Sequence, residues 1–88
     1  MNSWLVRFAA GLREDGPPAI DREEAQLILE LAGAAARSSG ARQFAPLAAW
    51  LAGRLAAETD RDTRLALLRR ACAAATAAGA AEEPLQID

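Results

Sequence analysis

The fold is decided by the stretch IDREEAQLILELAGAAARSSG, residues 20–40. Asp21 can accept a hydrogen bond from the backbone N–H of Glu24, and the Glu24 carboxylate can reach back, an arrangement that starts many helices. Apolar residues then recur every three or four positions, and Gly40 suits a left-handed helix end. The stretch therefore predicts a long amphipathic helix that ends just before Gly40.

Three further helices are predicted on either side of it. Upstream, Asn2 or Ser3 can cap a helix that the breaker residues 14–18 bring to an end. Downstream, Pro46 fits the first turn of a third helix, and an aspartate at 60 or 62 caps a fourth helix that ends at Gly79. Four amphipathic helices with short connections predict an all-α fold, a small antiparallel four-helix bundle.

The length of 88 residues predicts one domain, over residues 1–79, followed by a mobile acidic tail at 80–88. Alanine makes up roughly a quarter of the chain, so its core needs close helix contacts and a few large anchors. The predicted core anchors are Trp4, Phe8, Ile28, Leu31, Leu47, Trp50, Leu51 and Leu68.

The charge of the chain disfavours two classes of partner. Ten basic residues, all arginine, are spread among twelve acidic ones for a formal net charge of −2, which disfavours nucleic acid and anionic membranes as partners. No stretch is apolar enough to span a bilayer, and a single cysteine fits a reducing compartment, so the expected location is the cytoplasm.

The residues that most catalytic and metal sites need are absent from the sequence. It contains no His, Lys or Tyr, which removes the usual general bases and the imidazole ligands. The only thiol, Cys72, falls on the apolar stripe of the fourth helix, where it would act as a small hydrophobic residue. We therefore expect no enzyme, no metal site and no cofactor.

One segment has residues that suit a ligand or a partner: Arg37, Ser38, Ser39, Gly40 and Arg42, between the second and third helices. Guanidinium groups beside a helix N-terminus can bind phosphate or carboxylate. The same residues also describe a helix end followed by a turn, with Arg37 complementing the helix dipole and Arg42 in solvent. The sequence leaves both interpretations open.

Several short motifs carry a resemblance to a known family. They are LILELA (27–32), AAAR (34–37), GAR (40–42), APL (45–47) and WLAG (50–53), with NSWL at the start (2–5). Over about residues 2–57 the chain resembles a short helical domain of unknown function that is widespread in actinobacteria. That family is often encoded beside, or fused to, molybdenum-cofactor guanylyltransferases, so the resemblance implies a molybdenum-cofactor enzyme as partner.

The chain departs from the family pattern at the turn. The family often has a histidine before Gly-x-Ala-Arg and a proline after it, where this chain has Ser38-Ser39 and Gln43-Phe44. A role that depends on that imidazole therefore does not carry over, whereas Arg42 and Pro46 match.

The leading functional hypothesis is a non-catalytic accessory domain that binds a partner protein, linked to molybdoenzyme maturation. The alternative is a small module for an anionic ligand, such as a phosphate, nucleotide or pterin, held at the loop between the second and third helices. A homodimer is compatible with either function, because so small an alanine-rich core has little surface to bury.

Overall fold

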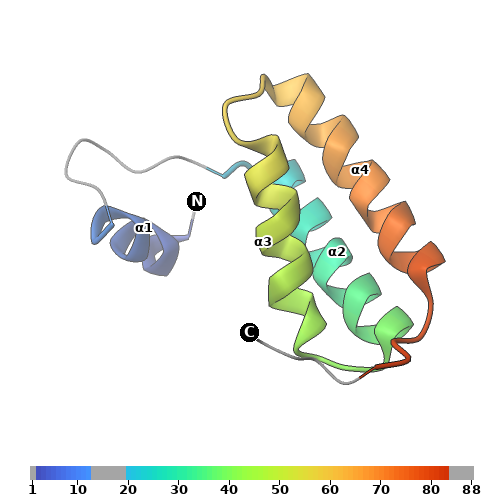
Figure 1. Ribbon diagram of the computed structural model, residues 1–88. Helices are drawn as coiled ribbons and strands as arrows, with labels where there is room; N and C mark the ends of the chain where they lie inside the picture. The colour runs from blue at the N-terminus through green and yellow to red at the C-terminus, as the bar shows by residue number, and fades with distance from the viewer. Residues whose placement is uncertain (1, 13–19, 84–88) are drawn as a thin grey trace.

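The structure of the chain, a computed structural model, describes residues 2–12 and 20–83. These residues form four helices, α1 (Ser3–Ala10), α2 (Arg22–Ser39), α3 (Phe44–Ala56) and α4 (Arg61–Ala78), and no strand (Figure 1). The predicted all-α fold with four helices is confirmed.

The helix ends follow the local signals in the sequence. Asn2 caps α1 by accepting from the N–H groups of Trp4 and Leu5, and Asp60 caps α4 through Thr63. Asp21 Oδ1 accepts from the N–H of Glu24 at 2.9 Å, so the predicted start of α2 is confirmed. Because each of these contacts joins residues two or three positions apart, the sequence alone specifies them.

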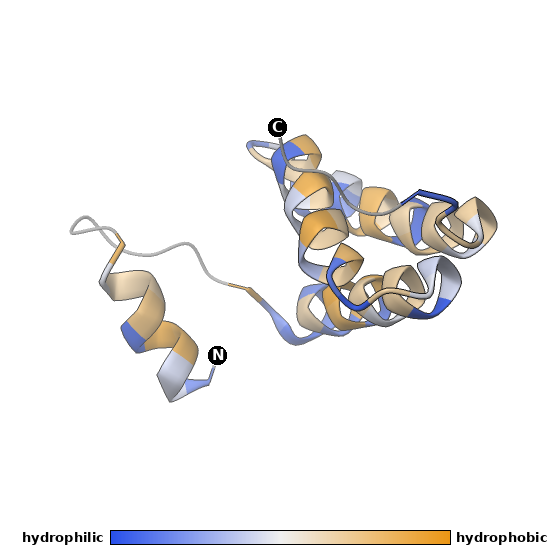
Figure 2. Cartoon of the chain, turned by 60° about the horizontal axis from the view of Figure 1, so that its bottom comes forward, coloured by the Kyte–Doolittle hydropathy of each residue, from blue (hydrophilic) through white to orange (hydrophobic). Residues whose placement is uncertain are grey.

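The helices that pack against one another are α2, α3 and α4. Helices that follow one another in this group, α2 with α3 and α3 with α4, run antiparallel as predicted, so α2 and α4 run parallel (Figure 1). Helix α1 belongs to none of the packed pairs among the described residues, and it lies beside the other three (Figure 2). Its connection to α2 runs through residues 13–19, outside the described part of the chain.

The core is small and rich in alanine. Leu31, Ala52 and Leu68 form its centre, one residue from each of α2, α3 and α4, and Ile28 packs against them. Ala35, Ala56 and Leu65 are also buried. Leu31 and Leu68 are therefore core residues as predicted, and Ile28 lies at the edge of the core.

Five of the predicted core anchors are wrong: Trp4, Phe8, Leu47, Trp50 and Leu51 are all exposed. On α3 the reason is geometric, because a stripe of alanines spaced by four, at 48, 52 and 56, faces the bundle and lets α3 approach closely. The leucines lie on the neighbouring stripe and point outward. On α1 the reason is that the helix packs against no other helix.

Two residues with left-handed backbone allow a test of the helix ends. Gly40 has φ 83°, and its position has open space around it, whereas Glu58 adopts φ 64° despite its side chain. We expect Gly40→Ala to lower the free energy of unfolding by about 1 kcal/mol. The left-handed backbone at this position is unfavourable for any residue that has a Cβ atom, whereas glycine adopts it freely. Glu58→Gly should raise it by about 0.5 kcal/mol, since relief of that strain exceeds the entropy lost by glycine. Urea unfolding measures both, and changes of the same sign would contradict the explanation.

Candidate functional site

The part of the chain that the structure describes holds no group of three or more Cys, Asp or Glu residues placed to bind a metal ion. Burial, and then the charge of Glu30, raises the pKa of the Cys72 thiol. Its Sγ lies 3.5 Å from the backbone oxygen of Leu27. This thiol is therefore protonated near neutral pH and is a poor nucleophile.

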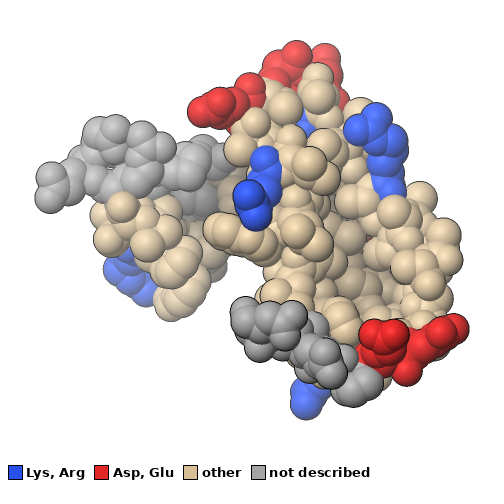
Figure 3. All heavy atoms as spheres, in the orientation of Figure 1, with Lys and Arg blue, Asp and Glu red and all other residues tan. Residues whose placement is uncertain are grey.

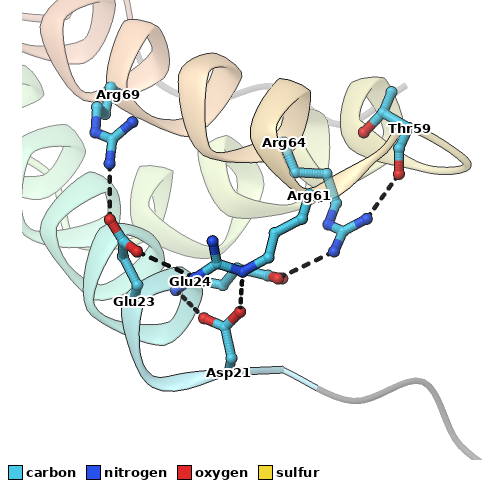
Figure 4. A network of polar contacts seen from close by, with 7 residues as sticks. All are labelled: Asp21, Glu23, Glu24, Thr59, Arg61, Arg64 and Arg69. Carbon is cyan, nitrogen blue, oxygen red and sulfur yellow. Dashed lines mark hydrogen bonds and ion pairs between the residues drawn. The ribbon is translucent and has the colours of Figure 1, made fainter.

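The most polar part of the surface lies where α2 and α4 begin (Figure 4). Arg61 bonds Asp21 at 2.7 Å and Glu23 at 3.1 Å, and Arg69 reaches the other oxygen of Glu23 at 2.7 Å. These side chains are about half exposed, so water screens the attraction and each pair contributes little to stability. Each of the carboxylates drawn in Figure 4 forms an ion pair with an arginine of α4. The network therefore connects α2 to α4.

One ion pair of this group is shielded from water. Glu24 is 8% exposed and binds Arg64 at 3.1 Å. The Arg64 guanidinium also donates to the backbone oxygen of Thr59 at 2.6 Å. Removing either partner would leave a poorly hydrated charge, so this pair fixes how α2 and α4 align.

The acid side of the stability curve tests the ion pairs. The hydrogen bond from Arg61, and then the one from the Glu24 amide, lower the pKa of Asp21 from 3.8 to about 2. Because the folded value is depressed, the stabilisation is fully present above pH 3.8 and is lost as the pH falls through about 2. Carbon-detected NMR titration should give a midpoint near pH 2 for Asp21, and Arg61→Gln should raise it toward 3.8, with the hydrogen bond from the Glu24 amide still lowering it. An unchanged midpoint in that variant would exclude the Arg61 contact as the cause.

The predicted loop site lies at the opposite end of the same two helices. Ser38 Oγ donates to the backbone oxygen of Thr76 and accepts from the N–H of Gly79, at 3.3 and 2.9 Å. The backbone oxygen of Ser39 accepts from the N–H of Ala81 at 3.1 Å. The segment just after Gly79 is thus attached to α2, and the predicted mobile tail falls, in its last five residues, outside the described residues.

Hydroxyl and backbone N–H groups of this loop are engaged within the protein. The Ser39 hydroxyl bonds both backbone groups of Ala41, at 3.1 and 3.2 Å. At the start of α3 the N–H groups of Phe44 and Ala45 donate to the preceding turn, and Pro46 has none. The Arg37 guanidinium lies over Gly33, only 2.8 Å from where a Cβ would be, and therefore points back along α2.

The structure therefore brings Ser38, Ser39 and Gly40 together as a helix-end junction, with Gly40 as the left-handed cap of α2. The Arg37 guanidinium lies over Gly33 of α2, and Arg42 lies exposed in the turn before α3. Of the two interpretations of this segment, the helix end followed by a turn matches the geometry.

A substitution tests the structural role of Ser38. We expect Ser38→Ala to lower the free energy of unfolding by about 1 kcal/mol, because it removes the bridge between the ends of α2 and α4. Ser3→Ala on α1, which lies outside the packed helices, is the matched control and should change it little. Equal effects of the two substitutions on urea unfolding would refute this role.

The sequence did not predict an apolar hollow that lies between α3 and α4. Two hollows of about 430 and 220 Å³ share Ala48, Leu51 and Ala75 and so form one continuous groove. Leu31 of α2 lies at its floor. We term this the α3–α4 groove and define it by Leu47, Leu51 and Leu55 of α3 with Leu67, Ala71 and Ala75 of α4.

The groove presents large apolar side chains to water. Leu51 and Leu55 are 59% and 71% exposed, and Trp50, at 66%, extends the apolar surface along the outside of α3. Uncharged residues fill the hollowed centre of this face, with basic side chains on either side and acidic ones towards its ends (Figure 3). A second hollow of about 530 Å³, between α2 and α3, is less apolar because Glu24, Glu58 and Arg64 line it.

One signal in the sequence could have revealed the groove. On α3 the leucines 47, 51 and 55 and the alanines 48, 52 and 56 each repeat every four residues, which makes two adjacent stripes. Only one of these stripes can face the core. Because leucine side chains are larger, the sequence analysis placed the leucine stripe in the core. In the structure the alanine stripe faces the core, because alanines let α3 pack closely on α2.

Comparisons of this chain with known families, proteins and structures identified no relative. A scan against protein-family profiles, a search of curated proteins and a search of solved structures each found no match to this chain. The resemblance to the actinobacterial domain therefore stays a prediction. In the described residues, no helix is both long and apolar enough to cross a membrane.

Proposed function

We propose that this chain is a non-catalytic accessory domain that binds a partner protein through the α3–α4 groove. The observation that supports it best is the outward-facing leucine stripe of α3 beside a continuous apolar hollow. Contiguous apolar surface of this kind is characteristic of interaction sites in small proteins. Isolated exposed leucines would not carry the same argument.

The shape of the groove favours a helix as the bound element. Its walls are two antiparallel helices, and the third helix, α2, lies behind it. A helix laid in the groove would complete a layer of four and would bury Leu47, Leu51 and Leu55 with an apolar stripe of its own. Such grooves recognise residues at helical spacing, so the partner should present an amphipathic helix.

The chemistry of the described residues gives little support to the other classes of function. The only thiol has a raised pKa, and the carboxylates at the start of α2 are paired with arginines. The hydroxyls of the loop that would hold an anionic ligand bond the backbone instead. No specific observation favours the ligand-binding alternative over the groove.

The resemblance noted in the sequence names the first partner to test, a molybdenum-cofactor guanylyltransferase from the same organism. We expect the purified domain to bind it and Leu51→Glu/Leu55→Glu to weaken binding at least about tenfold, since two buried leucines contribute more than about 1.4 kcal/mol. Isothermal titration calorimetry measures the affinity.

Leu29→Glu is the matched control, because Leu29 is 72% exposed on α2 and takes no part in the groove. This control should bind like the wild type. Equal binding by the groove variant would refute the groove as the docking surface. Absence of binding by the wild type would refute this enzyme as the partner.

A further inference from the structure

Helix α1 carries an apolar surface that no other helix covers in the described chain. The rings of Trp4 and Phe8 stack with their centroids 5.4 Å apart, yet both residues remain more than half exposed. Leu12 continues the same stripe at i+4 and is 69% exposed. The one charged residue of the helix, Arg7, lies at the edge of this stripe and can stay in water.

The length of α1 makes this exposure more significant. Isolated helices shorter than about 12 residues are marginal in water, because nucleation costs more than a few turns return. Helix α1 has 8 residues. A helix so short and so apolar needs a packing surface to be stable.

The α3–α4 groove has the dimensions for it. At about 1.5 Å per residue α1 is about 12 Å long, and the groove follows α3, which is about 20 Å long. Both surfaces are apolar, and both have large side chains at helical spacing. The chain thus contains an uncovered helix and an uncovered groove that match in size and chemistry.

We propose that α1 of one chain occupies the α3–α4 groove of a second copy, and that the exchange is reciprocal. The chain's own α1 lies on another face, where Asn2 and Leu5 share a hollow with Ala25 and Leu29 of α2. The groove opens on the side away from α2, whose Leu31 forms its floor. A two-fold exchange covers both surfaces in both copies and leaves no open end for further assembly.

The apolar area matches what a stable dimer requires. Seven large side chains on the two surfaces are between 40% and 71% exposed: Trp4 and Phe8 of α1 with Leu12 just after it, and Leu47, Trp50, Leu51 and Leu55 of α3. Removing them from water in two copies would bury on the order of 1,500 Å², the size of a specific interface.

This inference rests on the proposed function, because the same groove serves both, and it adds a competition between partner and self-association. Binding of a partner helix would displace α1 of the second copy. The free protein is then a dimer, and the partner complex contains one copy of the domain.

Sedimentation equilibrium of the whole chain tests the exchange. We expect the wild type, and the control Leu29→Glu, to have twice the 9.3 kDa mass of one chain. Two variants should be monomers: Trp4→Glu/Phe8→Glu, which loses the inserted helix, and Leu51→Glu/Leu55→Glu, which loses the groove. All changed side chains are exposed, so circular dichroism should show each variant folded.

The decisive measurement is an equimolar mixture of these two monomeric variants. One intact helix and one intact groove meet in the mixed pair, so a dimer should return that dissociates at least about tenfold more readily than the wild type, because one of two linked contacts is lost. A mixture that stays monomeric overturns the exchange. So does a helix variant that still dimerises, which would mean that two grooves meet directly.

The outcomes separate this inference from the proposed function. A monomeric wild type that still binds its partner through Leu51 and Leu55 overturns the exchange and leaves the docking function in place. A dimer that follows the exchange pattern but binds no guanylyltransferase supports the exchange and refutes that partner.

Discussion

The parallel pairing of α2 and α4 is the constraint on which the rest of the structure depends. Two parallel helices place their positive N-terminal dipole ends side by side, which is unfavourable unless negative charge is supplied there. Both caps are aspartates, and α4 returns arginines to the carboxylates of α2, so the charges at this end are compensated. Ser38 joins the other ends of the two helices through Thr76 and Gly79. Helix α3 runs antiparallel to both and packs against this pair, more closely on α2 than on α4 (Figure 1).

The sequence predicted the parts of the fold that depend on near neighbours. The caps at Asn2, Asp21 and Asp60 and the left-handed end at Gly40 involve residues at most four apart, so their signals are local and readable. The ion pairs and the Ser38 junction join residues about 40 positions apart, and no local pattern specifies them. The sequence also did not specify which face of α3 is buried. Alanines let two helices approach more closely than leucines do, and this contact forms only when the neighbouring helix is in place. The same difference between local and distant contacts applies to the loop, because the partners of Ser38 lie at Thr76 and Gly79, where no local pattern could place them.

The distribution of large side chains separates this chain from a domain built only for stability. A core of Leu31, Leu65 and Leu68 with three alanines buries little apolar area, while two tryptophans, a phenylalanine and several leucines remain in water. Turning the leucine stripe of α3 inward would bury larger side chains but would hold α3 farther from α2, so the close packing of the alanines leaves the leucines in water. A small domain with a thin core has little stability to give up. The outward leucine stripe is the feature on which the proposed docking function rests.

The proposed docking would link binding to folding in this chain. Whatever covers the α3–α4 groove binds the folded state alone, because the groove exists only when α2 holds α3 and α4 in place. The covering helix supplies the fourth member that a bundle of this length lacks, and its apolar stripe replaces water against the leucines of α3. The ion pairs and the Ser38 junction that join α2 to α4 involve no residue of the groove. Binding in the groove would therefore leave them unchanged. The described part of the chain thus combines a pair of helices joined at both ends with an open groove, and in the proposed complexes the occupant of that groove would add to the stability of the fold.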